Sequence, residues 1–194
     1  ADATAIAKYY GLKLKSETPD TEPTTEPTTE PDSDTGSWQE ENGHYYYVNS
    51  DGSRAGAGWL KLKDGTYYLD ENGYRMEGLI NIGEKTYYLD PENGKRLTGF
   101  QTINKKVYYF RPSTGSMIHF GWVNINRNRY YFHDDGHAQT GLAVIGGERY
   151  FFRTDGSMIR SKWVYYWNSW YFASCKGNLY RNTWHYIDKK RYYF

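Results

Sequence analysis

The sequence contains a single cysteine, Cys175, among its 194 residues. This excludes an intrachain disulfide and a metal site built from several cysteines. No apolar stretch approaches the roughly 20 residues of a membrane-spanning helix, so we expect no membrane insertion. The chain begins with Ala1, and its last repeat stops mid-pattern at Phe194. We therefore expect it to be a fragment of a longer protein.

Aliphatic residues are also scarce. Aliphatic and aromatic residues together make up 38% of the chain, and 19% is aromatic, with 22 Tyr, 7 Trp and 8 Phe. Tyr and Trp bury a ring while one polar atom stays in contact with water. This composition favours thin, repeated layers over one thick aliphatic core.

The net charge of +1 is unevenly distributed and indicates three segments. Residues 1–15 have the apolar spacing of a short helix. Residues 16–37 repeat Thr-Glu-Pro-Thr, carry seven acids and no base, and are expected to form a disordered linker, either bare or O-glycosylated. Residues 38–194 carry 21 Lys and Arg and 15 Asp and Glu, a net charge of +6, and form the folded body.

The folded body repeats with a period of about 21 residues. Each unit opens on a large apolar residue, and eight residues later comes an aromatic pair such as Tyr67-Tyr68. A glycine such as Gly73 closes each complete unit, which gives seven full repeats and a truncated eighth. The opening residues are Trp38, Trp59, Leu79, Phe100, Trp122, Leu142, Trp163 and Trp184.

Each unit has two short β-rich runs around a polar or glycine-containing turn, which is typical of a β-hairpin. An isolated hairpin is marginally stable in water, so each one must pack against its neighbours. The predicted fold class is therefore all-β, a solenoid of stacked β-hairpins.

Strand alternation predicts which side chains form the core. One core column is the fourth position of the first strand: Leu62, Ile82, Ile103, Ile125, Ile145 and Ile187. The other is the residue after the aromatic pair: Val48, Leu69, Leu89, Phe110, Phe132, Phe152 and Phe194.

The opening residue and the second aromatic of the pair fall on the opposite face, where they should line grooves between successive hairpins. Trp59 with Tyr68 and Trp122 with Tyr131 are two such pairs. The densest set of exposed aromatics is expected between the seventh and eighth units, formed by Trp163, Trp170, Phe172 and Trp184. Most of the remaining tyrosines are expected to be structural.

Aromatic faces stack on the C–H faces of sugars and attract quaternary ammonium groups. Both contacts are weak at one site, but a linear polymer that spans several sites gains through effective concentration. The grooves therefore favour a polysaccharide or cell-wall polymer as ligand. A purely structural stalk that displays another module remains the alternative.

Two segments carry a family resemblance: TGFQTINKKVYYFRPSTGSM at 98–117 and GLAVIGGERYFFRTDGSM at 141–158. They closely resemble the cell wall-binding repeat. That superfamily includes pneumococcal choline-binding modules, glucan-binding repeats of streptococcal glucansucrases and the C-terminal repeats of clostridial toxins. The resemblance covers 38–194 and implies a non-catalytic module of a secreted or cell-surface protein.

The choline-binding branch of this superfamily needs an opening Trp, a Trp directly before the aromatic pair and an aromatic from the next repeat. Only the seventh unit carries both Trp residues, Trp163 and Trp170, with Trp184 in the next unit. The pattern is thus nearer to the glucan-binding and toxin repeats, and choline or teichoic-acid binding at one or a few sites is the alternative.

A second resemblance covers only ADATAIAKYYGL at the start of the chain. It is similar to the end of a dockerin, with Asp2 as the last calcium ligand and Lys8 and Tyr9 facing a cohesin. The complete dockerin would make a cohesin the partner. The rest of the calcium loop is absent, so no calcium is expected here. An ordinary amphipathic helix is the other interpretation.

No other chemistry is indicated. His133, Asp134, Asp135 and His137 gather in one loop, but the histidine spacing fits no zinc pattern, so no metal is expected. No catalytic arrangement or cofactor motif is recognisable. Arg and Tyr alternate in 126–131, as in proteins that hold single-stranded nucleic acid. The charge is modest and scattered, so we expect no nucleic-acid partner.

Overall fold

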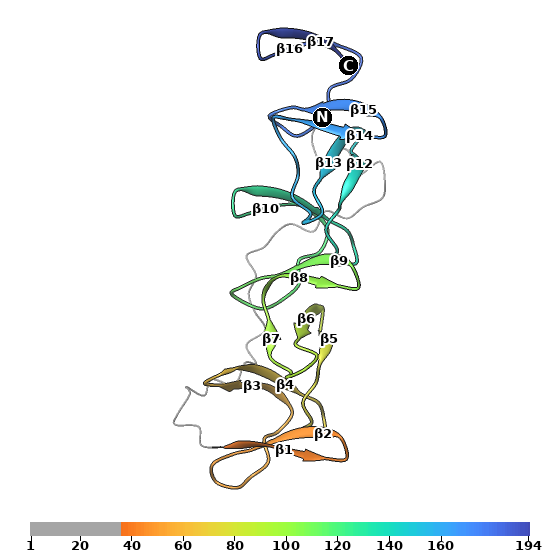
Figure 1. Cartoon of the computed structure of the whole chain (residues 1–194). Helices are drawn as coiled ribbons and strands as arrows, with labels where there is room; N and C mark the ends of the chain where they lie inside the picture. Colours follow the sequence, from red (N-terminus) through yellow and green to blue (C-terminus); the bar gives the residue numbers. More distant parts are fainter. Residues whose placement is uncertain (1–35) are drawn as a thin grey trace. The chain divides into compact units, whose positions relative to one another are not determined.

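The computed structural model describes residues 36–194, and within this range it contains β-strands and no helix (Figure 1). The helix predicted at 1–15 and nearly all of the linker predicted at 16–37 lie outside the described residues. The all-β prediction for the repeat region is confirmed.

The strands form antiparallel hairpins, one for each predicted repeat. The first four repeats contain β1 (Ser37–Glu41) with β2 (His44–Val48), β3 (Gly58–Leu62) with β4 (Gly65–Leu69), β5 (Gly78–Ile82) with β6 (Lys85–Leu89) and β7 (Arg96–Leu97), and β8 (Gly99–Ile103) with β9 (Lys106–Phe110). The last four contain β10 (Gly121–Ile125) with β11 (Asn128–Phe132), β12 (Gly141–Ile145) with β13 (Glu148–Phe152), β14 (Lys162–Tyr166) with β15 (Ser169–Ala173), and β16 (Trp184–Ile187) with β17 (Lys190–Tyr193).

Two residues connect the strands of each hairpin. In the fifth hairpin they are Asn126 and Arg127, whose φ angles are +48° and +65°. Positive φ at both positions defines a type I′ turn, whose twist matches that of the flanking strands. Trp167 and Asn168 form the same turn in the seventh hairpin, with φ angles of +46° and +57°.

The register places the opening residue opposite the second aromatic of the pair. Trp59 faces Tyr68, Trp122 faces Tyr131 and Trp163 faces Phe172. We call this side of each hairpin its groove face. The other side, the core face, carries the first aromatic of the pair and the residue after the pair, as the alternation along the strand requires.

The residue after the aromatic pair forms the innermost column of the core, as predicted. Leu69, Leu89, Phe110 and Phe132 are fully buried, and Phe152 is nearly so. Val48 and Phe194, in the first and last hairpins, are half-buried.

The second predicted core column is only partly right. Ile125 and Ile187 are buried, but the equivalent residues of four other repeats are half-buried: Leu62, Ile82, Ile103 and Ile145. This position adjoins the hairpin turn, as the pairing of Ile103 with Lys106 shows. At the tip of a hairpin, fewer neighbouring atoms are available to cover a side chain.

The core consists of small clusters between neighbouring hairpins. In one cluster, Trp38 and Tyr47 from the groove face of the first hairpin pack on Leu60, Leu62 and Leu69 from the core face of the second. The same arrangement joins Trp59 and Tyr68 to the third hairpin. The thin repeated layers expected from the composition are therefore built by packing one groove face on the next core face.

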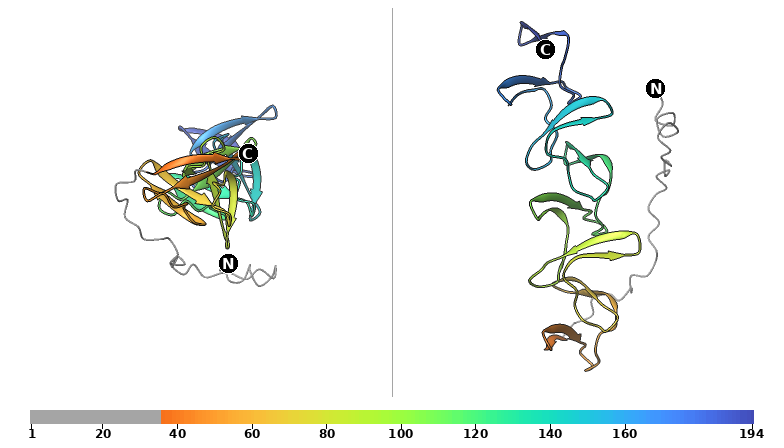
Figure 2. Two further views of the ribbon diagram at one scale, coloured as in Figure 1. Left: turned by 90° about the horizontal axis from the view of Figure 1, so that it is seen from below. Right: turned by 90° about the vertical axis from the view of Figure 1, so that its right-hand side faces the viewer.

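Successive repeats are also joined by a recurrent backbone hydrogen bond. It is donated by the residue 16 or 17 positions after the opening residue, which we call the tail residue. The acceptor is the carbonyl directly before the aromatic pair of the preceding hairpin. Arg75, Met117, Ala138, Met158 and Leu179 donate to Tyr45, Thr86, Val107, Arg129 and Arg149 at 2.7–2.8 Å. Viewed along the array, the hairpins point outward in different directions (Figure 2).

Candidate functional site

The seventh and eighth hairpins enclose an aromatic cavity of about 720 Å³. Trp163 from β14 stands edge-on to Trp170 from β15, with ring centroids 6.4 Å apart and planes at 88°. The eighth hairpin adds Tyr192, whose ring centroid lies 5.0 Å from that of Trp163, together with Tyr193 and Phe194. All five residues that line this cavity are therefore aromatic, and Trp170 is 63% exposed to solvent.

Trp163, Trp170 and Phe172 lie on one face of the seventh hairpin, as strand alternation predicted, whereas Trp184, which was expected to join them from the next hairpin, does not line the cavity. Phe172 supports Trp163 at 5.2 Å and stacks on Tyr180, so it lies behind the cavity wall. Trp184 is exposed and contacts Tyr193 and the guanidinium of Arg191, which lies 4.3 Å from its ring centroid. It is not among the residues that line the cavity.

The sequence reasoning did not assign Tyr192 and Tyr193 to the site, and it placed Phe194, which also lines the cavity, in the core column. The available signal was the period itself, because each aromatic opening residue meets the first aromatic of the next repeat. These contacts are Trp38–Tyr67, Trp59–Tyr87, Phe100–Tyr130, Trp122–Tyr150 and Trp163–Tyr192, all with centroids 4.8–5.0 Å apart.

The other two predicted pairs have the same geometry. The rings of Trp59 and Tyr68 meet edge-on at 5.1 Å, and those of Trp122 and Tyr131 at 5.3 Å. Both tryptophans are half-buried. The structure thus places all three predicted aromatic pairs in equivalent grooves, and binding by these residues remains a prediction.

Arginine distinguishes these grooves from one another. The guanidinium of Arg129 lies 4.2 Å from the ring centroid of Trp122, and that of Arg96 lies 5.1 Å from that of Trp59. Within residues 36–194, no arginine makes such a contact with Trp163. Arg129 occupies the repeat position that Trp170 occupies in the seventh unit.

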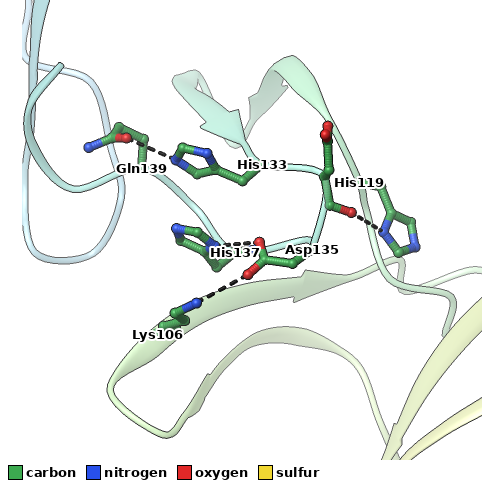
Figure 3. Close-up of polar contacts among 7 residues, drawn as sticks. Lys106, His119, His133, Asp135, His137 and Gln139 are labelled. Carbon is green, nitrogen blue, oxygen red and sulfur yellow. Dashed lines mark hydrogen bonds and ion pairs between the residues drawn. The ribbon is translucent and has the colours of Figure 1, made fainter. Parts of the chain in front are cut away.

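The histidine loop of the fifth repeat forms a polar cluster (Figure 3). The rings of His133 and His137 stack with centroids 4.2 Å apart, and His133 Nε2 donates to Gln139 Oε1 at 2.9 Å. Asp135 accepts from the His137 ring and, at 3.1 Å, from Lys106 Nζ of the fourth repeat. Burial raises the pKa of Asp135, but these hydrogen bonds outweigh it and hold the pKa well below its usual value.

This cluster ties two repeats together through the ion pair between Lys106 and Asp135. Across the part of the chain that the structure describes, no three His, Cys, Asp or Glu side chains are grouped to hold a metal ion. The described residues also contain no helix that is long and apolar enough to cross a membrane.

Comparison with known proteins places these grooves among similar repeats. The Choline-binding repeat family matches residues 120–163, and the Putative cell wall binding repeat family matches residues 36–53, 57–75 and 98–117. Glucosyltransferase-S of Streptococcus mutans is 28% identical over 161 residues, which are 77% of this chain and 9% of that protein.

Solved structures of Streptococcus pneumoniae proteins share the fold. CbpJ is 28% identical with a TM-score of 0.67, over 78% of this chain and 54% of that one. Choline binding protein F, solved in the presence of a peptidoglycan analogue, gives the same identity and TM-score over 78% of this chain and 53% of that one. The choline-binding domain of CbpL is 26% identical with a TM-score of 0.55, over 76% and 79%. The chain thus spans about half of the first two proteins.

Proposed function

Because the chain belongs to the superfamily of choline-binding and cell wall-binding repeats, we propose that residues 38–194 form a non-catalytic module that binds a cell-wall polymer or glucan. The observation that carries this proposal is the open aromatic cavity formed by Trp163, Trp170 and Tyr192. Its walls are large, rigid rings, of which Trp170 is exposed and Trp163 and Tyr192 are half-buried, and this suits a ligand held by ring contacts.

A sugar ring and a quaternary ammonium group are the two ligands that such walls hold best. A sugar ring between two perpendicular indoles presents its C–H bonds to the π-face of one indole and its edge to the π-face of the other. A quaternary ammonium is attracted to the same faces at ~0.5–2 kcal/mol per contact. We favour a sugar of a polysaccharide or cell-wall polymer as the ligand, because weak contacts repeated along the array match a repeated polymer.

Choline is the second candidate, and a specific feature favours it. The Trp163 cavity combines an opening Trp, a Trp before the aromatic pair and an aromatic from the next repeat, Tyr192. Both neighbours named as choline-binding, protein F and the CbpL domain, share the fold of these hairpins. Choline would then bind at this cavity, and the other grooves would contact sugars or be structural.

The deciding experiment is retention of the full chain on insoluble starch, dextran, purified cell walls and a choline-mimetic resin in parallel. We expect retention on at least one of these, reduced several-fold by Trp170→Ala. The matched control is Trp167→Ala, because Trp167 lies in the turn of the same hairpin, is 86% exposed and does not line the cavity. Equal retention of both variants, or no retention on any matrix, would count against the proposal.

Salt separates this function from nucleic-acid binding. Binding to a polyanion falls steeply as salt rises, because neutralised phosphates release counterions. Binding to a neutral glucan or to a buried ammonium changes little. Retention that persists at moderate salt supports the proposal, and retention that collapses contradicts it.

The location of the protein and the roles of the segments before the repeats are also proposals. Similarity to cell wall-binding repeats indicates association with a cell surface, and we propose that the protein is secreted to reach it. We further propose that residues 16–37 act as the spacer between the repeats and a dockerin-like end at residues 1–15, whose partner is a cohesin.

A further inference from the structure

Tail residues occupy one fixed position in each repeat, and in five repeats the backbone hydrogen bond described above holds them against the preceding hairpin. Their chemistry changes along the chain. They are Arg54, Arg75 and Arg96 in the first three repeats, and Met117, Ala138, Met158 and Leu179 in the next four. Cations thus stand where the later repeats have apolar side chains.

Arg75 is buried within the first groove. Its guanidinium carbon lies 4.4 Å from the ring centroid of Tyr45 and 5.4 Å from that of Trp38. Its side chain is 8% exposed and forms an ion pair with Glu77. Its Nε is buried without a hydrogen-bond partner. The aromatic faces are therefore part of what compensates this buried cation.

Arg96 occupies the second groove in the same way. Its guanidinium carbon lies 5.1 Å from the ring centroid of Trp59, and Nη1 donates to the Thr114 carbonyl at 3.1 Å. The side chain runs along Gly115, where an added Cβ would stand 2.6 Å from the Arg96 Cδ. A Cβ added at Gly94 would likewise stand 2.5 Å from the Arg75 Cδ. Both closing glycines have positive φ and leave room for the arginine stem.

We propose that Arg75 and Arg96 are internal occupants of the first two aromatic grooves. Each guanidinium covers the Trp face that a sugar or an external ammonium would need, so these two grooves stabilise the array and take no ligand. The inference rests on the proposed function. It confines ligand binding to grooves without such an arginine, of which the Trp163 cavity is the most open.

The energetics favour the internal cation. A cation–π contact contributes roughly 0.5–1 kcal/mol at an exposed site and about 2 kcal/mol when desolvated. The guanidinium is tethered to the chain, whereas a free ligand loses translational and rotational freedom when it binds. An external ammonium of equal contact strength cannot displace it.

The test replaces each arginine with the residue that later repeats use, in Arg75→Met, Arg96→Met and the double variant. Methionine is suitable because Met117 and Met158 are tail residues of the fourth and sixth repeats. Tetramethylammonium is the probe, and its binding stoichiometry on the full chain is measured by titration calorimetry. We expect one additional site for each arginine replaced.

The matched control is Arg160→Met, which removes an exposed arginine whose Nη2 donates to the Arg127 carbonyl and which covers no aromatic ring among residues 36–194. It should leave the stoichiometry unchanged. An unchanged stoichiometry in folded Arg75→Met and Arg96→Met, together with no tetramethylammonium rescue of the alanine variant described next, would overturn the inference, even if the parent chain is retained on a polymer. New sites in a chain that no polymer retains would support the inference and contradict the proposed function.

A rescue experiment covers the case in which the methionine side chain itself fills the groove. Arg75→Ala leaves a space between Trp38 and Tyr45 and should lower the melting temperature. Tetramethylammonium chloride should restore part of that loss, compared with sodium chloride at equal concentration, and should raise the melting temperature of the variant more than that of the parent chain. Equal effects of both salts on the variant would contradict internal occupancy.

Discussion

Trp38 in the first hairpin and Trp163 in the seventh occupy the same repeat position and make the same two ring contacts. Trp38 lies 5.2 Å from Tyr47 and 4.9 Å from Tyr67, and Trp163 lies 5.2 Å from Phe172 and 5.0 Å from Tyr192. Around Trp38 the guanidinium of Arg75 covers the ring and leaves a smaller cavity of about 260 Å³ beside Trp38 and Tyr47, whereas around Trp163 a cavity of about 720 Å³ remains that no arginine of residues 36–194 covers.

The comparison separates two roles within one repeat pattern. The opening residue and the aromatic pair build the stack in both grooves. The tail residue and the residue before the pair then determine whether the groove is filled or open. The groove proposed to bind a ligand therefore differs from the first groove in that no arginine of the described residues covers its tryptophan ring, and not in its aromatic walls.

The largest expected difference between the two grooves is the loss of stability when the first aromatic of the pair is replaced by alanine. Tyr67 is 2% exposed in the filled groove and donates to Asp64 Oδ2 at 2.9 Å, whereas Tyr192 is half-buried in the open one. Tyr67→Ala should lower the free energy of unfolding by about 3–5 kcal/mol, as large core truncations do. Tyr192→Ala should cost much less, and denaturant unfolding of both variants measures the difference. Equal losses would show that the two grooves are equally structural.

The next largest effect is expected when the residues before the aromatic pair are exchanged between two grooves. Arg129→Trp places an indole where Trp170 stands in the seventh repeat, beside a groove whose tail residue is Met158. Removing the cation and adding a ring should increase retention on the polymer several-fold. The reciprocal Trp170→Arg should decrease it, because an arginine would then cover Trp163. Opposite signs are required, and a shared direction would contradict the assignment of these residues as groove walls.

A smaller effect is expected at the turn beside the open groove. Trp167 adopts a φ of +46°, which a bulky side chain disfavours and asparagine tolerates. Trp167→Asn should therefore raise the free energy of unfolding by about 1 kcal/mol. Asn126, which occupies the equivalent turn position of the fifth hairpin at +48°, shows that asparagine fits there. A loss of stability would show that Trp167 makes a contact that outweighs its strained backbone.

The smallest effect is a pH dependence in the filled region. Hydrogen bonds from Lys95 and Tyr67 lower the pKa of Asp64 below its usual 3.8, against a smaller opposing effect of burial. Since the folded pKa is depressed, this contribution to stability is present above pH 3.8 and is lost as the pH falls through the folded value. Unfolding midpoints measured across this range should fall more in the parent chain than in Asp64→Asn. If the unfolding midpoints of the two proteins fell in parallel with pH, Asp64 would not be the source of this pH dependence.

Much of the fold followed from the sequence, because hairpin register and strand alternation are local properties. The period of 21 residues and the column from Leu69 to Phe152 are examples. The fourth-position column was only partly right, since its burial depends on how far the neighbouring hairpin extends over the turn. Tyr192 and the arginine tail residues were missed for a related reason. Their contacts join different repeats, and alternation within one strand says nothing about the stacking direction.

The recurrent backbone hydrogen bond between repeats has a mechanical consequence. Each hairpin is held only by its two neighbours, so tension applied to the ends of the array loads the repeats in series. The weakest link opens first and releases one repeat, which when extended spans roughly 70 Å of chain. A surface-bound module built this way unfolds one repeat at a time under tension. Each unfolding step dissipates mechanical work, and the remaining repeats stay folded.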